Sequence, residues 1–480
     1  MTVTRREFVT TLGLLATAVG MGQTDLAKVV SAFGGPGAAT LPLGDANGKP
    51  KVIWVHGAEC TGCSTSILGL YEDASGVAVP GATAAGNIST ASALGMYALQ
   101  TKTPPSTMAA VDVLEGTGVN PSYRTLYNAG LNVDTSEFAI NIADVLIDFI
   151  DLQYHETVMG TGGDSAYTYL SGEMASSTTP FVLVVEGAVQ DFGGGGYWGK
   201  KGTAGVSAPW CSIAADGSGM VNPPELSFDD VVEQLATKDA CAAVIAIGQC
   251  AAFGGYPACI GPDLIPNGHP KGQTGAKGVF DFLVARGQVS GYSGATAATA
   301  ASNKVINVPG CPVNPWWFTL TVVAWLVDAV TANPADTTGH DASGALGILN
   351  GQLEIAPNAN VDNQRRLTAV YGHLLHGKYC PRYPKYAARI FASTPGDVNG
   401  GCLKNIGCKG LSTMSMCGRH GWNAQQPQNT HADLNAAVQD LAYKSTDGTT
   451  LGGFCMTAGA PCMGCTEKGY PDAFTPFVVR

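Results

Sequence analysis

The sequence has little charge and few long apolar runs, and each shortage excludes a class of protein. Only 13% of its 480 residues are charged, whereas 45% are hydrophobic, which excludes an intrinsically disordered chain. Beyond the N-terminal segment, no stretch reaches the roughly 20 uninterrupted apolar residues of a membrane-spanning helix, and we expect no anchor helix after FTPFVVR. We expect a globular chain of two or three domains, with no membrane helix of its own.

Positive charge is scarce as well. The chain has 26 Lys or Arg against 37 Asp or Glu, which gives a net charge of −11. Because binding to nucleic acid or anionic lipid depends on concentrated basic side chains, neither partner is expected. The sequence also lacks a phosphate-binding loop, a nucleotide-binding glycine fingerprint and a Ser-His-Asp set. None of the enzymatic activities that depend on these motifs is therefore expected.

The first recognisable feature that is present is an export signal. Arg5 and Arg6 precede the short apolar run LGLLATAVGMG, which is typical of a twin-arginine leader, and we assign residues 1–45 to it. An ordinary surface helix is the alternative. The twin-arginine route generally exports folded, cofactor-loaded proteins. Because such a leader directs export, we expect a periplasmic location or the outer face of the cytoplasmic membrane.

Four apolar runs predict buried parallel strands, and each run ends in glycine. They are KVIWVHG (51–57), PFVLVVEG (180–187), AAVIAIG (242–248) and KVINVPG (304–310). Helix-like segments at 137–160, 228–240 and 276–287 alternate with them. The alternation predicts an α/β domain with a doubly wound parallel sheet.

Cysteines follow three of these four strands. In a doubly wound sheet, ligands bind at the carboxyl ends of the strands, beside the point where the strand order reverses. The loops after the first, third and fourth runs deliver Cys60, Cys63, Cys250 and Cys311 to that edge. Four thiolates that converge there predict a metal-cluster site.

The rest of the chain divides around this sheet. We expect the sheet domain to span 46–330, with insertions at about 72–135, 190–225 and 286–303. From 331 to 480 the strand pattern fades and cysteine density rises, which predicts a loop-rich second domain organised by metal.

The fourteen cysteines admit three interpretations, namely disulfides, zinc sites or iron–sulfur clusters. A disulfide framework belongs to small chains without a core, and C-x2-C loops are too short to gain much stability from one. CTGC and CMGC would suit a zinc ribbon. The glycines beside them, together with the Cys-Pro steps at Cys311 and Cys380, favour iron–sulfur ligation.

Two further ligand groups lie in the second half. The segment 367–382 reads as one helix, on which His376 and Cys380 share a face, with His373 as a rival ligand. Cys402 and Cys408 complete a set of three cysteines and one histidine. The last group consists of Cys417, Cys455, Cys462 and Cys465. Four thiolates there would hold a four-iron cubane, whereas three would leave a three-iron cluster.

Seven motifs, in order, resemble those of the small, electron-transfer subunits of nickel–iron hydrogenases. They are ECTGCSTS (59–66), LQYHETVM (152–159), PFVLVVEGAV (180–189), GQCAAFGG (248–255), VPGCPVNP (308–315), CLKNIGCKG (402–410) and AGAPCMGCTE (458–467). The resemblance implies a flavodoxin-like, doubly wound parallel sheet domain followed by a loop-rich iron–sulfur-binding domain.

The resemblance also assigns the three groups. It makes Cys60, Cys63, Cys250 and Cys311 ligands of a proximal [4Fe–4S] cluster, and His376, Cys380, Cys402 and Cys408 ligands of a distal [4Fe–4S] cluster. Three residues separate His376 from Cys380, where the family usually has two. The medial cluster falls to Cys417, Cys462 and Cys465; because Cys455 occupies the place of a proline found in many relatives, we expect a medial [4Fe–4S] cluster with Cys455 as fourth ligand.

The remaining candidates have smaller parts. Oxygen-tolerant relatives carry extra cysteines where this chain has Gly62 and Gly255, so the resemblance implies an ordinary proximal cubane. Glu59 matches an acidic residue on the family's proton path, and a simple surface carboxylate is the alternative. We expect Glu186, His155 and Glu156 to serve packing, backbone binding or the subunit interface. Cys241 reads as packing, and Cys211 and Cys259 are unassigned.

By this resemblance, a partner large subunit splits H2 at a Ni-Fe centre, and this chain passes the electrons to an external acceptor such as a cytochrome or other redox protein. A dimer of such heterodimers is compatible with the resemblance. Two alternatives stay open, namely an iron–sulfur subunit of another oxidoreductase and a zinc-stabilised exported binding protein. A visible absorption spectrum separates the last of these, because zinc sites are colourless.

Overall fold

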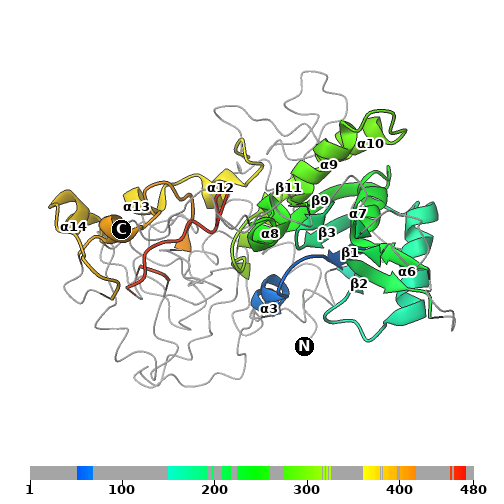
Figure 1. The fold of residues 1–480 in the computed structure, drawn as a ribbon, viewed down its shortest axis with the longest axis horizontal. Helices are drawn as coiled ribbons and strands as arrows, with labels where there is room; N and C mark the ends of the chain where they lie inside the picture. The colour runs from blue at the N-terminus through cyan, green and yellow to red at the C-terminus, as the bar shows by residue number, and fades with distance from the viewer. Residues whose placement is uncertain are drawn as a thin grey trace, which may run out of the picture.

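The computed structural model describes residues 51–68, 150–191, 197–198, 208–217, 224–259, 275–315, 317–318, 321–322, 324–325, 361–378, 380, 382–396, 401–417, 454–456 and 459–471. The expected leader and the expected insertion at about 72–135 lie outside these residues. Figure 1 shows a sheet with its helices in one half of the molecule and the short segments that follow residue 361 in the other.

The sheet has five parallel strands in the order β11-β9-β3-β1-β2. They are β1 (Lys51–His56), β2 (Asp151–His155), β3 (Phe181–Glu186), β9 (Cys241–Ile247) and β11 (Val305–Val308). Numbered along the chain, the order is 2-1-3-4-5, so the strand order reverses between β1 and β3. The four runs predicted as strands are β1, β3, β9 and β11.

The prediction was wrong for β2, the one strand of this sheet that is not among the four predicted runs. The segment 137–160 was expected to be helical, but residues 151–155 form β2, which pairs in parallel with β1. This strand lies at the sheet edge, and only its last two residues are buried. A half-exposed edge strand mixes polar and apolar residues, so it lacks the continuous apolar run of a central strand.

Both faces of the central strands are buried. On one face Ile53, Val55 and Leu183 belong to a single core cluster with residues of the helices α6 (Gly163–Ser176), α7 (Phe228–Ala236) and α9 (Val279–Gly287). On the other face, the ring of Trp54 packs 5.5 Å from that of Phe318. Burial of one such side chain stabilises the fold by about 1.5–3 kcal/mol, so the strand ends beside the cysteine loops are held on a rigid base.

Helix α8 (Gly248–Phe253) directly follows β9, and α3 (Gly62–Leu68) follows the loop after β1. The expected insertion at about 190–225 contains the short strands β5 (Tyr197–Trp198), β6 (Ala208–Pro209) and β7 (Ser212–Ala215). Strand β4 (Val189–Gln190) lies at its start and β8 (Glu225–Ser227) at its end. Strand β10 (Ala276–Lys277) pairs with β4, and the 3-10 turn η4 covers Tyr256–Ala258. Within 286–303, helix α10 (Ala295–Ser302) packs against α9.

The described part of the second half contains short elements. They are α12 (Thr368–Tyr371), α13 (Leu375–Lys378), α14 (Tyr383–Ala387) and the 3-10 turn η6 (Leu403–Ile406). The single helix predicted over 367–382 is therefore wrong, and Cys380 lies beyond the end of α13. The break has a tertiary cause, because the amides of Leu375 and His376 donate to the carbonyls of Thr413 and Gly410 instead of to the preceding turn.

Buried hydrogen bonds join the two halves. Gln249 donates to the carbonyl of Glu467 over 2.8 Å. The guanidinium of Arg365 donates to the carbonyls of Val305 and Asn303 over 2.7 and 2.5 Å. These bonds fix loop segments that have few regular elements of their own. Among the described residues, no helix has the length and apolar character needed to cross a membrane.

Candidate metal-cluster sites

The structure brings the four strand-end cysteines together. Cys60 and Cys63 follow β1, Cys250 lies on α8 after β9, and Cys311 follows β11. Burial raises the pKa of Cys250 to about 12, and the neighbouring thiols of Cys311 and Cys60 contribute to that rise. Burial likewise raises the pKa of Cys63, with contributions from Glu186, Cys250 and Cys311. We name these four residues the sheet-edge group.

The backbone approaches these sulfur atoms too closely for any residue larger than glycine. A Cβ on Gly248, where φ is +81°, would lie 2.3 Å from Cys63 Sγ. Cβ atoms on Gly62 and Gly255 would each lie 2.9 Å from a thiol sulfur, that of Cys60 and of Cys250 respectively. The amide of Val313 also donates to Cys63 Sγ over 3.4 Å. Close backbone and amide donors around several thiols fit an iron–sulfur cluster, whose sulfur atoms accept such hydrogen bonds.

A second set of thiols meets in the other half, and it includes Cys455. We name Cys417, Cys455, Cys462 and Cys465 the middle group. Burial raises the pKa of Cys417 to about 12, and the thiol of Cys455 contributes to that rise. Burial is the largest cause of the raised pKa of Cys465, and the thiols of Cys417, Cys462 and Cys455 raise it further. Cys455 therefore lies near Cys417 and Cys465, and it also lies near Cys408 of the third group, whose thiol adds to the rise that burial causes in the pKa of Cys455.

The third set is the outer group, Cys380, Cys402 and Cys408. Burial raises the pKa of Cys380 to about 12, and the thiols of Cys408 and Cys402 contribute to the shift. The thioether sulfur of Met456 lies 3.4 Å from Cys380 Sγ and 3.9 Å from Cys408 Sγ. A buried, mutually repelling set of thiols with soft sulfur neighbours suits a soft metal or cluster.

His376, the predicted fourth member, lies on α13 and is buried. Its ring contacts those of Tyr386 and Tyr383 at centroid distances of 4.4 and 5.3 Å. Burial and the nearby Lys404 lower its pKa, which favours the neutral imidazole that binds metals. Its Nε2 atom is buried and has no hydrogen-bond partner in the described part of the chain. In the described part of the chain, its imidazole ring interacts with the two tyrosines and with Lys404.

Two close approaches connect the three groups in a row. Burial raises the pKa of Cys465 and the nearby backbone of Cys311 opposes that rise, which places the sheet-edge group beside the middle group. The amide of Cys462 donates to Cys408 Sγ over 3.3 Å, which joins the middle group to the outer group. The order along the molecule is thus sheet edge, middle, outer.

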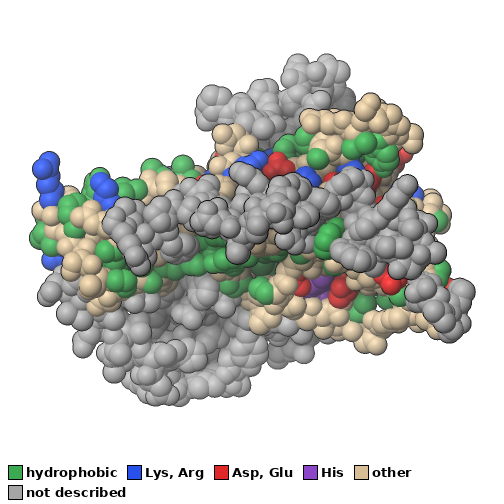
Figure 2. All heavy atoms as spheres, in the orientation of Figure 1, with side chains coloured by type: hydrophobic (Ala, Val, Ile, Leu, Met, Phe, Trp, Pro, Cys, Tyr) green, Lys and Arg blue, Asp and Glu red, His purple; other side chains and the backbone are tan. Residues whose placement is uncertain are grey.

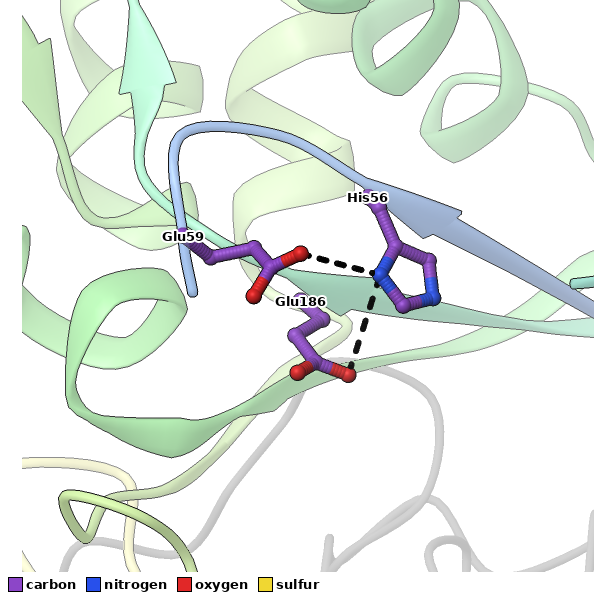
Figure 3. Close-up of side chains that lie close together, drawn as sticks. All are labelled: His56, Glu59 and Glu186. Carbon is purple, nitrogen blue, oxygen red and sulfur yellow. Dashed lines mark hydrogen bonds and ion pairs between the residues drawn. The ribbon is translucent and has the colours of Figure 1, made fainter. Parts of the chain in front are cut away.

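Beside the sheet-edge group lies a cluster of imidazole and carboxylate groups, drawn in Figure 3. His56 Nδ1 lies 3.2 Å from Glu59 Oε1 and 4.0 Å from Glu186 Oε2. Glu186 accepts hydrogen bonds from the amides of Cys63 and Ser64 and from the Ser64 hydroxyl. The expectation that Glu186 binds backbone amides is confirmed, and its role is to fix the start of α3, where Cys63 lies.

His56 was not predicted from the sequence as a functional residue. Its amide donates to Glu156 Oε1 over 3.0 Å, and its ring lies 4.8 Å from that of His155. Burial raises the pKa of Glu156 to about 7, whereas burial and His56 lower that of His155 to about 4. The one available signal was the spacing of His56, three residues before Glu59 at the end of the first predicted strand. The cluster holds groups able to exchange protons near neutral pH.

Three cysteines, Cys211, Cys241 and Cys259, do not belong to the three groups. Cys241 is buried in β9, where its thiol donates to the carbonyl of Ala243, as the packing interpretation expected. Cys211 is half-buried against the core of the sheet domain, and burial raises its pKa to about 11. Cys259 is half-buried and its amide donates to the carbonyl of Tyr256.

Comparison with known proteins identifies two family models. One, described as NADH ubiquinone oxidoreductase, 20 Kd subunit, matches residues 130–325. The other describes the C-terminal part of the NiFe/NiFeSe hydrogenase small subunit and matches residues 371–437.

Relatives match over the whole chain. The periplasmic [NiFeSe] hydrogenase small subunit of Desulfomicrobium baculatum is 24% identical, over 100% of this chain and 99% of the relative. The periplasmic [NiFe] hydrogenase small subunit 1 of Nitratidesulfovibrio vulgaris is 25% identical, over 99% and 93%. A solved reduced, active form of the Ni-Fe-Se hydrogenase from Desulfomicrobium baculatum has the same fold, with a TM-score of 0.51 at 23% identity, covering 90% of this chain and 99% of that one.

Proposed function

As a member of the NiFe/NiFeSe hydrogenase small-subunit family, this chain is part of a hydrogenase complex with a large subunit, and we propose that it conducts electrons from H2 oxidation through three iron–sulfur clusters to an external acceptor. The supporting observation is the row of three thiol groups, in which the backbone of Cys311 lies beside the Cys465 thiol and the amide of Cys462 donates to Cys408 Sγ. When bound, such a cluster takes up and releases single electrons.

The sheet-edge group would hold the proximal [4Fe–4S] cluster through Cys60, Cys63, Cys250 and Cys311. Gly62 and Gly255 support an ordinary cubane, because a Cβ at either position would already lie 2.9 Å from a ligand sulfur. The Glu186 carboxylate holds the amides of Cys63 and Ser64, so it positions one ligand. Glu59, bonded to His56 and Thr61, is the candidate end of a proton path toward the large subunit.

The middle group would hold a medial [4Fe–4S] cluster, with Cys455 as the fourth ligand. The proximity of Cys455 to Cys417 and Cys465 supports this assignment. The outer group would hold the distal [4Fe–4S] cluster together with His376, whose buried Nε2 atom has no hydrogen-bond partner among the described residues. All three clusters are therefore of the four-iron type in this proposal.

The domain assignment is part of the proposal. We infer a flavodoxin-like domain over 46–330, supported by the 2-1-3-4-5 strand order, and a loop-rich cluster-binding domain over 331–480. Residues 1–45 would be a twin-arginine leader that directs export to the periplasm or the outer face of the cytoplasmic membrane. Relatives whose names include the word periplasmic support this location.

The experiment is anaerobic co-purification of the chain with its large subunit, followed by H2-dependent reduction of benzyl viologen. We expect viologen reduction and a brown protein whose low-temperature EPR spectrum, after reduction, shows several interacting iron–sulfur centres. A colourless complex that contains zinc and does not consume H2 would refute the proposal. A coloured complex without H2 consumption would instead favour a subunit of another oxidoreductase.

A further inference from the structure

The segment that forms the outer group is basic, in a chain that is acidic overall. Residues 371–417 contain six Lys or Arg and one Asp, whereas the whole chain has 26 Lys or Arg and 37 Asp or Glu. The single acidic residue, Asp397, lies outside the described residues. The sign of the charge within this segment is therefore opposite to that of the whole chain.

Several of these basic side chains lie at the surface close to His376. Lys404 is exposed, and its Nζ atom lies 5.6 Å from the centroid of the Tyr386 ring, which in turn contacts the His376 ring. Arg389 is also exposed, and Lys385 is half-buried. Figure 2 shows Lys and Arg atoms both at the end of the molecule where α14 lies in Figure 1 and over the half with the sheet, whereas the Asp and Glu atoms visible on this face all lie over the half with the sheet.

Exposed apolar side chains accompany the charge. Ile390 is 48% exposed and Tyr383 is 41% exposed. The carbonyl of Ile390 accepts a hydrogen bond from the amide of Cys402 over 2.8 Å, so this side chain lies one backbone contact from a proposed ligand. We name Tyr383, Lys385, Arg389, Ile390 and Lys404 the outer face. Apolar side chains within a ring of one charge are typical of a protein-binding surface.

We propose that the outer face docks a soluble redox protein that presents an acidic surface around its own cofactor; this deepens the proposed function and rests on it. Like charges at an interface are costly and opposite charges accelerate encounter, so a basic exit face selects an acidic acceptor. Because the patch is small, the complex is of the weak, transient class common among electron-transfer proteins. Each H2 oxidised in the large subunit yields two protons and two electrons, and two one-electron acceptors are each reduced by one electron at this face.

An anionic membrane surface could satisfy the same charges, but the geometry favours a protein. Surface binding to lipid relies on an amphipathic helix with a long apolar face, and α14 has only five residues. A lipid headgroup layer would also cover the side chains nearest the proposed electron exit without offering an acceptor.

The test uses the complete heterodimer and two one-electron acceptors of opposite charge, an acidic [2Fe–2S] ferredoxin and a basic c-type cytochrome. We compare Lys404→Glu and Arg389→Glu with Lys238→Glu, a matched charge change just after the end of α7 on the sheet half. The readouts are the second-order rate of acceptor reduction under H2 as a function of ionic strength, and ferredoxin affinity by calorimetry. Each rate is divided by the viologen rate of the same preparation.

For the wild type, we expect ferredoxin reduction to slow as ionic strength rises. Lys404→Glu and Arg389→Glu should each lower the low-salt ferredoxin rate about three- to tenfold and weaken its binding, whereas Lys238→Glu should match the wild type. A ferredoxin rate insensitive to both variants and to salt, a cytochrome rate that falls with rising ionic strength and in both variants, or binding to anionic vesicles but to neither protein would overturn the inference. A wild-type complex that fails to reduce viologen would refute the proposed function instead.

Discussion

Replacement of Gly248 by alanine should displace one ligand of the sheet-edge group. The added Cβ would lie 2.3 Å from Cys63 Sγ, and because ordinary contact begins at 3.4 Å, the sulfur would have to retreat by about 1.1 Å. The backbone adds a second cost, because φ is +81° and a non-glycine residue there is disfavoured by roughly 1–2 kcal/mol. A ligand shift of that size is expected to prevent stable assembly of the proximal cluster.

The assay is iron content of the anaerobically purified heterodimer, read together with H2-dependent viologen reduction. Gly248→Ala should lose about four irons, those of one [4Fe–4S] cluster, and viologen reduction should fall at least about tenfold. Gly291→Ala is the matched control, because φ is +73° and no atom lies within 4 Å of its added Cβ. Full iron content and a normal proximal EPR signal in Gly248→Ala would refute the reasoning about Cys63.

Two other predictions rest on the structure and a third on the sequence of the expected leader. Cys455→Ala should produce a three-iron EPR signal in the oxidised complex. The control Cys241→Ala, at a buried cysteine outside the three groups, should not produce it. An unchanged spectrum in Cys455→Ala would exclude Cys455 as a ligand. Burial raises the pKa of Glu156 from 4.5 to about 7, so its stabilising effect is complete below pH 4.5 and is lost as the pH rises through 7. Glu156→Gln should therefore flatten the decline of the unfolding temperature from pH 5 to 8, measured by differential scanning fluorimetry; an identical slope would contradict this. Exchange of Arg5 and Arg6 for lysine should leave the precursor in the cytoplasm, and normal periplasmic recovery on fractionation would contradict the leader assignment.

The sequence allowed prediction of the central strands but not of the edge. Strands β1, β3, β9 and β11 are buried on both faces, so each is a continuous apolar run that ends in glycine. Strand β2 is half-exposed and joins the sheet only by pairing with β1. Its five residues have no apolar run, and the helical pattern before it masked the boundary.

The cysteine groupings were predictable where topology alone determines them. Parallel strands end at one edge, so Cys60, Cys250 and Cys311 had to meet once the sheet was assumed. The surroundings of His376 were not predictable in this way, because hydrogen bonds to Thr413 and Gly410 interrupt the helix that its sequence favours. His56 became significant only when the fold placed Glu186 beside it.

Net charge was a poor guide to local charge. The overall value of −11 led to the expectation that neither nucleic acid nor anionic lipid is a partner, although 371–417 carries an excess of Lys and Arg. The expectation against nucleic acid and lipid rested on the average over the chain. A surface is built from the few segments that fold together, so its sign depends on their composition alone.

The central claim is that three groups of thiols hold three four-iron clusters in a row. Its most direct test is Mössbauer spectroscopy with metal and acid-labile sulfide analysis on the ⁵⁷Fe-enriched, anaerobically purified heterodimer, corrected for the iron of the Ni-Fe centre. We predict about twelve irons and about twelve sulfides in this chain, all in [4Fe–4S] clusters, and no zinc. Stoichiometric zinc in the cysteine sites, or iron sufficient for only one or two clusters, would contradict the account.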